Sequence, residues 1–212
     1  MLAFILRRLA QAVIVMVTVA FIAFMLFQFV GDPVAILLGQ DATPDQVAEM
    51  RAALGLDKPF VVQFWHFLVN AAQGEFGLSL RQSAKVSRLI AERFPATLEL
   101  SLVAAFIALA LGVPMGVYAA LKRGSFMSQL FMTLSLLGVS LPTFLIGILL
   151  ILVFSVTLGW FPSFGRGEVV QLGWWSTGLL TTKGWHHIVL PAITLAIFQL
   201  TLIMRLVRAE ML

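Results

Sequence analysis

Residues 126–158 read FMSQLFMTLSLLGVSLPTFLIGILLILVFSVTL, an apolar run without a charged side chain. A single α-helical membrane crossing needs about 20 such residues, so this run can span a bilayer and is long enough to suggest a second crossing. Pro142 stands in the middle of the run, directly after Leu141, and proline breaks or kinks a helix. Whether the run crosses once or twice decides how the remaining chain is arranged.

The composition indicates an integral membrane protein. Of 212 residues, 60% are hydrophobic and only 11% are charged, whereas globular domains carry about 25% charged residues. The net charge of +4 comes from basic residues that flank apolar runs, a pattern that indicates membrane orientation and no nucleic-acid partner. Cysteine is absent, which excludes disulfides, thiolate metal sites and thiol catalysis.

We expect an all-α integral membrane protein with four transmembrane helices. The apolar runs that predict these spans are Leu9–Val30, Ala96–Leu121, Phe126–Leu158 and Ile188–Met204. The first run is too long for the apolar region of a cleaved signal peptide, so it is predicted to remain as a span.

Basic pairs give the predicted orientation. They stand before the first run, after the second and after the fourth, at Arg7/Arg8, Lys122/Arg123 and Arg205/Arg208. Four crossings place all three pairs on one side, which the positive-inside rule identifies as the cytoplasm, with both termini there. Two crossings by residues 126–158 would move the last pair outside, so we favour a single crossing.

The predicted organisation follows from these spans. Residues 1–30 form the cytoplasmic N-terminus and first span, residues 31–95 an external helical region, and residues 96–207 three further spans with an external loop at about 159–187. Residues 208–212 begin a cytoplasmic segment. Trp160, Trp174, Trp175 and Trp185 are typical of the aromatic belt at a membrane surface.

Three helices are predicted within the external region. Thr43 and Gln46 form a capping-box pair, with Pro44 at the first helical position and Gly55 after the last turn. The next stretch, FVVQFWHFLVNAAQG, carries a polar stripe and predicts a helix lying in the membrane interface or against the bundle. A short helix in KVSRLIAERF is expected to end before Pro95.

The chain carries no predicted catalytic, metal or cofactor site. It lacks a Walker phosphate-binding loop, and the spans hold almost no ionisable group that could drive transport. Glu99 is expected near the N-terminus of the second span, where the helix dipole favours a carboxylate. His66, His186 and His187 lack carboxylates at ligand spacing and are interpreted as interfacial polar residues.

Two stretches inside the spans break helical regularity. Gly112 and Gly116 have the spacing of close helix packing, and Pro114 between them predicts a kink. Ser140, Pro142 and Thr143 place hydroxyls and a helix breaker at membrane depth. Such breaks occur where helices pack or line a cavity, so these three residues are candidates for a translocation pathway, with helix packing as the alternative.

The last residues, RLVRAEML, continue a charged helix beyond the fourth span. Arg205 and Arg208 are three residues apart and share one helix face. A snorkelling anchor accounts for the two arginines but leaves the continuation through Glu210 unexplained.

Several motifs together resemble one family. They are FILRRL, Gly31-Asp32-Pro33, LGLDKPFVVQFWHFLVNAAQGEFGLSL, RFPATLELSL, GVPMGVYAALKRGS, GVSLPTFLIGILLILVFSVTLGWFPSFG and HHIVLPAITLAIFQLTLIMRLVRAEML. In this order they are similar to the permease subunits of binding-protein-dependent ABC importers of the dipeptide/oligopeptide/nickel family, in its first-permease branch. Val30 departs from that pattern, which often has proline before Gly-Asp-Pro.

The resemblance implies a six-span permease in the bacterial cytoplasmic (inner) membrane, of which this chain holds the first four spans. It implies a second homologous permease subunit, two cytoplasmic ATP-binding subunits, an extracytoplasmic solute-binding protein and contact with membrane lipid as partners. Arg205, Arg208 and Glu210 then begin the region that couples to the ATPase, and the sequence looks truncated before the coupling loop. ATP hydrolysis is expected on the partners, so the chain itself is not expected to be an enzyme.

Two functions are therefore expected. The first is a permease that moves peptides or similar small solutes, such as glutathione-like molecules, nickel chelates or sugars. The alternative is a non-transporting membrane scaffold or assembly protein, or an inactive truncated permease.

Overall fold

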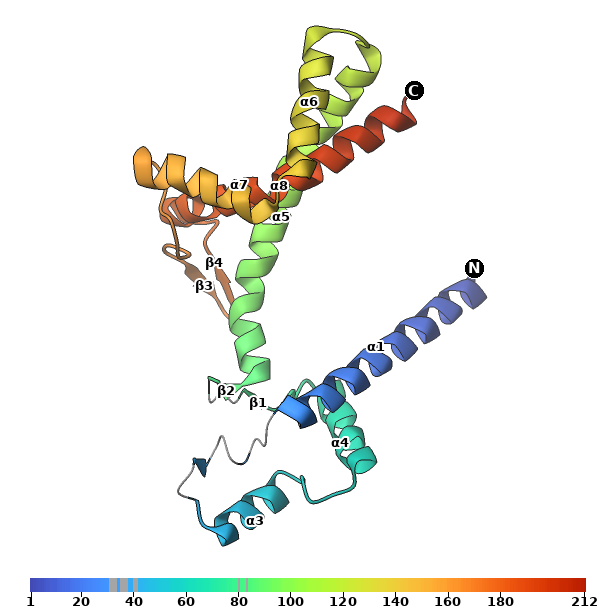
Figure 1. Cartoon of the computed structure of the whole chain (residues 1–212), viewed down its shortest axis with the longest axis vertical. Coiled ribbons are helices and arrows are strands. Elements are labelled where there is room, and N and C mark those ends of the chain that lie inside the picture. Colours follow the sequence, from blue (N-terminus) through green and yellow to red (C-terminus); the bar gives the residue numbers. More distant parts are fainter. Residues whose placement is uncertain (31–33, 35–37, 40–41, 80, 83) are drawn as a thin grey trace. The chain divides into compact units, whose positions relative to one another are not determined.

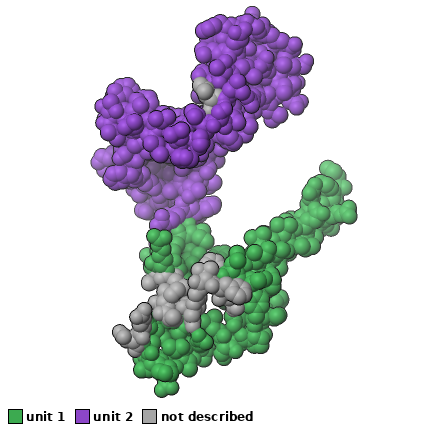
Figure 2. Space-filling view, in the orientation of Figure 1, with its two compact units in different colours: residues 1–90 green, residues 91–212 purple. Residues whose placement is uncertain are grey.

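The computed structural model describes residues 1–30, 34, 38–39, 42–79, 81–82 and 84–212. These residues are mainly helical, with two short hairpins (Figure 1). They form two compact units, residues 1–90 and 91–212, which Figure 2 shows in different colours. The Gly31-Asp32-Pro33 motif lies outside the described residues.

The first unit begins with a long apolar helix. Helix α1 runs from Leu2 to Val30, and its Ala3–Leu26 part is long and apolar enough to cross a membrane. The shorter elements that follow are α3 (Pro44–Ala53), α4 (Phe60–Ala72), β1 (Leu78–Ser79) and its antiparallel partner β2 (Ala84–Lys85).

The predicted cap of α3 is confirmed. The backbone N–H of Gln46 donates to Thr43 Oγ1 at 3.4 Å, and the Thr43 N–H donates to Gln46 Oε1 at 3.0 Å. Pro44 occupies the first turn, where its missing N–H costs nothing, and Gly55 follows the helix with a positive φ of 68°. Local sequence alone therefore determines this helix.

Helix α4 packs against α1 through aromatic rings. Phe21 and Phe24 of α1 meet Phe60 and Phe64 of α4 with ring centroids 5.1–5.7 Å apart. Phe24 also contacts Phe67 at 5.5 Å, so the contact extends over two turns of α4. Of the two predicted locations, membrane interface or bundle, the structure shows a helix that lies against another helix.

Helix α5 runs without interruption from Val86 to Leu121. The prediction that a separate short helix ends before Pro95 is therefore wrong, because the helix passes through this proline. The expectation for Glu99 is wrong for the same reason. Glu99 lies in the helix interior, several turns from the N-terminus, where the helix dipole has little effect.

The apolar run of residues 126–158 is broken at Pro142, as its sequence predicted. Helix α6 (Phe126–Ser140) ends before Leu141, and α7 (Thr143–Leu150) continues into the π-helix η1 (Ile151–Thr157). The two halves are bent by 105°. Helix α8 (Thr182–Glu210) completes the second unit and extends beyond the predicted span at both ends. Within the described residues, three helices can cross a membrane alone, and the bent pair makes a fourth span if it counts as one.

Helices α5 and α8 run in the same direction (Figure 1). A Cβ built on Gly112 would lie 3.1 Å from the Leu200 carbonyl oxygen, and one built on Gly116 would lie 2.7 Å from that of Met204. Residue numbers at the contacts therefore increase together on both helices, which means that the helices are parallel. Buried alanines continue this close contact at Ala104, Ala108, Ala192 and Ala196.

The bent pair runs in the opposite direction to α8. Successive contacts join Ser135 to Arg205, Gly138 to Thr201, and Gly147 to Thr194. Residue numbers on α8 decrease as those on α6 and α7 increase, and this holds on both sides of the break. Because α5 and α8 are parallel, the segment between them makes one net return, which is the arrangement that a single crossing by residues 126–158 requires.

A hairpin lies between η1 and α8. Strand β3 (Val170–Leu172) pairs antiparallel with β4 (Trp175–Thr177), and the turn contains Gly173 with a φ of 66°. Trp160, Trp174 and Trp185 are exposed, as a membrane-belt role requires. Trp175 differs, because its indole N–H is turned inward to Glu99.

Candidate functional site

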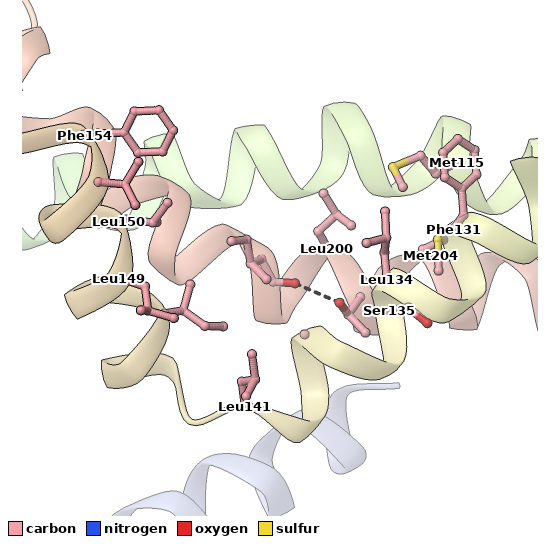
Figure 3. A pocket seen from close by; sticks show the side chains of 15 residues that line it. Met115, Phe131, Leu134, Ser135, Leu141, Leu149, Leu150, Phe154, Leu200 and Met204 are labelled. Atoms are coloured by element: carbon pink, nitrogen blue, oxygen red, sulfur yellow. Dashed lines mark hydrogen bonds between the residues drawn. The ribbon is translucent and has the colours of Figure 1, made fainter. Parts of the chain in front are cut away.

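An apolar cavity of about 490 Å³ lies beside the helix break, between α5, α6, α7, η1 and α8. Figure 3 shows Leu141, Leu149 and Phe154 along one wall and Leu200 and Met204 of α8 along another. This volume lies in the range of about 300–1,000 Å³ that is typical of small-molecule sites. The break therefore borders a space and does not merely join two packed helices.

The break follows from local chemistry. Proline lacks a backbone N–H and disfavours helical backbone in the residue before it, so α6 ends at Ser140 and Pro142 caps α7 with φ −58° and ψ 136°. Gly138 then lets α6 approach α8, since a Cβ there would lie 2.7 Å from Thr201 Oγ1.

The polar groups of the cavity are turned to the backbone. Ser135 Oγ donates to the Met132 carbonyl at 2.7 Å, and Thr201 Oγ1 donates to the Ile197 carbonyl at 2.9 Å, the dashed line in Figure 3. A hydroxyl that is hydrogen-bonded to its own helix has less hydrogen-bonding capacity left for a solute. The cavity surface is consequently almost entirely hydrocarbon.

The three predicted pathway residues lie at the break itself. Ser140, Pro142 and Thr143 are exposed in this chain. The cavity is lined by their neighbours Gly138 and Leu141. Their role in a pathway remains a prediction.

The three residues predicted to begin the coupling region lie on the last two turns of α8. Arg205 Nε donates to Ser135 Oγ at 3.3 Å, which places one guanidinium at the end of the cavity. Arg208 Nε is buried and has no hydrogen-bond partner among the residues that the structure describes. Glu210 is exposed. A buried donor without an acceptor is costly.

The predicted packing stretch lies at the crossing of α5 and α8. Gly112 and Gly116 are both buried and face α8, while Pro114 is accommodated inside α5. A residue larger than glycine at position 116 would also meet Val207, whose Cβ lies 2.8 Å from the built atom.

Sequence analysis missed a polar cluster at the other end of the second unit. Glu99 is only 5% exposed, and its carboxylate accepts hydrogen bonds from Arg166, Trp175 and Gly178. Arg166 and Glu99 are 67 residues apart in the sequence, so no spacing rule connects them. The available signal was Glu99 itself, because a carboxylate inside an apolar helix requires a partner.

The architecture is that of a multi-pass helical membrane protein. The sequence matches the description "Binding-protein-dependent transport system inner membrane component" over residues 112–212, and that of the N-terminal part of such membrane components over residues 1–101. The chain belongs to this family, as the sequence motifs predicted, and is a multi-pass inner-membrane protein.

Named relatives agree with this assignment. A protein of Brucella suis biovar 1, provisionally named as a peptide transport system permease, is 43% identical over all of this chain, as is one of Brucella abortus. The glutathione transport system permease protein of Salmonella typhimurium is 34% identical over 99% of this chain. The chain spans 65% of the length of the Brucella relatives and 64% of the Salmonella protein.

Proposed function

We propose that this chain is a permease subunit of an ATP-driven ABC importer that moves peptides or similar small solutes across the cytoplasmic membrane. The observation that carries the proposal is the arrangement of the second unit. Helices α5 and α8 are parallel, the broken helix of α6, α7 and η1 runs antiparallel to α8, and together they border a cavity. A helix interrupted at membrane depth suits a pathway better than a passive anchor.

The energy source is proposed to lie on partner subunits. The described spans contain few ionisable groups, and the buried Glu99 is already paired with Arg166. A proton- or ion-coupled carrier would need such groups free inside the membrane. ATP-binding subunits on the cytoplasmic side, a second permease and a solute-binding protein on the other side complete the proposed assembly.

Charge supports the proposed orientation. Because α5 and α8 are parallel, their C-terminal ends lie at the same end of the second unit, which brings Lys122 and Arg123 to the side of Arg205 and Arg208. Four basic residues at one end favour the cytoplasm for that end. The hairpin end is then external, and Arg205, Arg208 and Glu210 begin the surface proposed to meet an ATPase.

The pathway is proposed to pass the break between α6 and α7. Ser140, Pro142 and Thr143 are exposed beside the cavity and would face a second permease or the transported solute. Peptide is the favoured cargo because the relatives carry peptide and glutathione transport names.

Uptake tests this proposal. Cells that lack the gene are supplied with isotope-labelled dipeptide, oligopeptide or glutathione, with and without depletion of ATP. We expect the deletion to abolish uptake of at least one of these probes, and the wild-type gene to restore it only in cells with ATP. Unchanged uptake of all three probes after deletion would favour a membrane scaffold.

A further inference from the structure

The segment of residues 165–181, here called the strap, is bonded to α5 through one buried carboxylate. Glu99 Oε2 accepts from Arg166 Nη2 at 3.1 Å and from the Gly178 backbone N–H at 3.3 Å. Glu99 Oε1 accepts from Trp175 Nε1 at 3.3 Å. One side chain of α5 thus contacts the beginning, middle and end of the strap.

The Arg166 guanidinium extends this cluster within the strap. Its Nη1 donates to Ser176 Oγ at 2.6 Å and its Nη2 donates to the Ser176 carbonyl at 2.5 Å. Arg166 therefore joins strand β4 to Glu99. Charge-assisted bonds of this kind are about twice as strong as bonds between neutral groups.

The far end of the strap is fixed to α8. Thr181 caps α8, since its Oγ1 accepts from the Gly184 N–H at 3.0 Å and donates to the Glu168 carbonyl at 2.7 Å. A Cβ built on Gly184 would overlap the carbonyl oxygen of Gly178, so only glycine fits at position 184. The strap consequently bridges α5 and α8 at the end opposite to Arg205.

The strap covers a space and not a packed core. A cavity of about 200 Å³ lies beneath it, lined by Ala96 and Leu100 of α5, Ile188 and Pro191 of α8, and the polar cluster. Apolar burial stabilises in proportion to the area removed from water, and here that contact is incomplete. The hydrogen bonds of Glu99 therefore supply the polar contacts that hold the strap to α5.

We propose that Glu99 and Arg166 form a latch that holds the strap closed over this cavity and joins the ends of α5 and α8 into one body. Removing Arg166 would leave the buried Glu99 carboxylate without its cation, which is strongly unfavourable, whereas removing Glu99 would free the partly exposed Arg166 and release the strap from α5. The latch is therefore a permanent brace that stays closed while other helices move. This last consequence rests on the proposed function, whereas the latch itself does not.

The absence of cysteine from these 212 residues allows a direct test, with any cysteine elsewhere in the full-length protein replaced by serine. Ala96→Cys places one thiol in the cavity beneath the strap, in the full-length protein in its membrane. The rate of labelling by a membrane-impermeant maleimide then measures how often the strap opens. Ala96 is half-buried, so the background labels at a finite rate, and we expect at least a tenfold faster rate when Glu99→Gln frees the strap.

A matched control comes from an ion pair on the same strap. Glu168 and Lys183 are paired through side chains that are 63% and 67% exposed, so Glu168→Gln removes a carboxylate without touching the latch. Labelling of Ala96→Cys should remain unchanged in this control. An equal increase in both variants would show that any change in the strap opens the cavity, and would overturn the latch.

A second variant covers the case in which Glu99→Gln does not fold. Glu99→Leu combined with Arg166→Met removes both charges together and leaves no buried ion alone. We expect this double variant to reach the membrane and to label at least tenfold faster. Labelling within twofold of the background would overturn the proposal. Because no transport is measured, this result is independent of the uptake test.

Discussion

Gly116 of α5 faces the carbonyl oxygen of Met204 on α8 at a distance that excludes any larger residue, since a Cβ at position 116 would lie 2.7 Å from that oxygen. Together with the contact between Gly112 and Leu200, it holds the two helices side by side and in the same direction. Close backbone approach at small residues is a principal source of helix association in membranes, where burial from water contributes little.

The first prediction concerns this crossing. Gly116→Leu forces α5 away from α8, and overpacking of this kind costs about 1–3 kcal/mol. We expect a lower melting temperature of the detergent-extracted protein. Gly124→Leu cannot serve as a control because of its positive φ of 80°, so Leu111→Ala, at an exposed position on α5, is the comparison. Equal melting of the Gly116 and Leu111 variants would contradict the packing account.

A second prediction addresses the packing of α1 on α4. Phe24 contacts three rings of α4, and each aromatic pair contributes about 0.5–1.5 kcal/mol. We expect Phe24→Ala to loosen α4, which faster amide hydrogen exchange over residues 60–72 would report. Val15→Ala, at an exposed position on α1, should leave that exchange unchanged. Exchange in α4 that is the same in both variants would show that the rings do not hold it.

The third prediction concerns the cap of α3. Thr43→Ala removes the acceptor for the Gln46 N–H and should cost the helix about 1 kcal/mol. Hydrogen exchange over residues 44–53 should increase several-fold. Thr43→Ser keeps the hydroxyl and should preserve protection, whereas equal protection in all three proteins would contradict the capping geometry.

Orientation gives a fourth prediction. Single cysteines are placed at Lys122, near the basic end, and at Ser163, in the loop before the hairpin. In spheroplasts an impermeant thiol reagent should label Ser163→Cys, and should label Lys122→Cys only after permeabilisation. The opposite pattern would reverse the proposed orientation.

Sequence patterns predicted the features that depend on nearby residues. The capping box at Thr43 and the break at Pro142 each arise from chemistry within a few positions. The spacing of Gly112 and Gly116 predicted a face for close helix packing, but not that α8 is the partner. The distribution of basic residues also favoured one crossing by residues 126–158. The order in which α6 and α7 contact successive residues of α8 agrees with it.

Features that join distant residues were not predictable in the same way. Pro95 looked like a helix boundary, yet α5 continues through it. The partners of Glu99 lie 67 to 79 residues further along the chain. Their approach depends on how α5, the strap and α8 come together, which no local pattern encodes.

The proposed role as a permease with separate ATPases is tested most directly by its partners. The tagged full-length protein is extracted from its native membrane in mild detergent, and the proteins that remain bound are identified and assayed for ATP hydrolysis. We predict a second permease and ATP-binding subunits, and loss of the ATP-binding subunits when Arg208→Glu reverses the charge at the end of α8. A stable preparation that contains no ATP-hydrolysing partner would contradict the proposal.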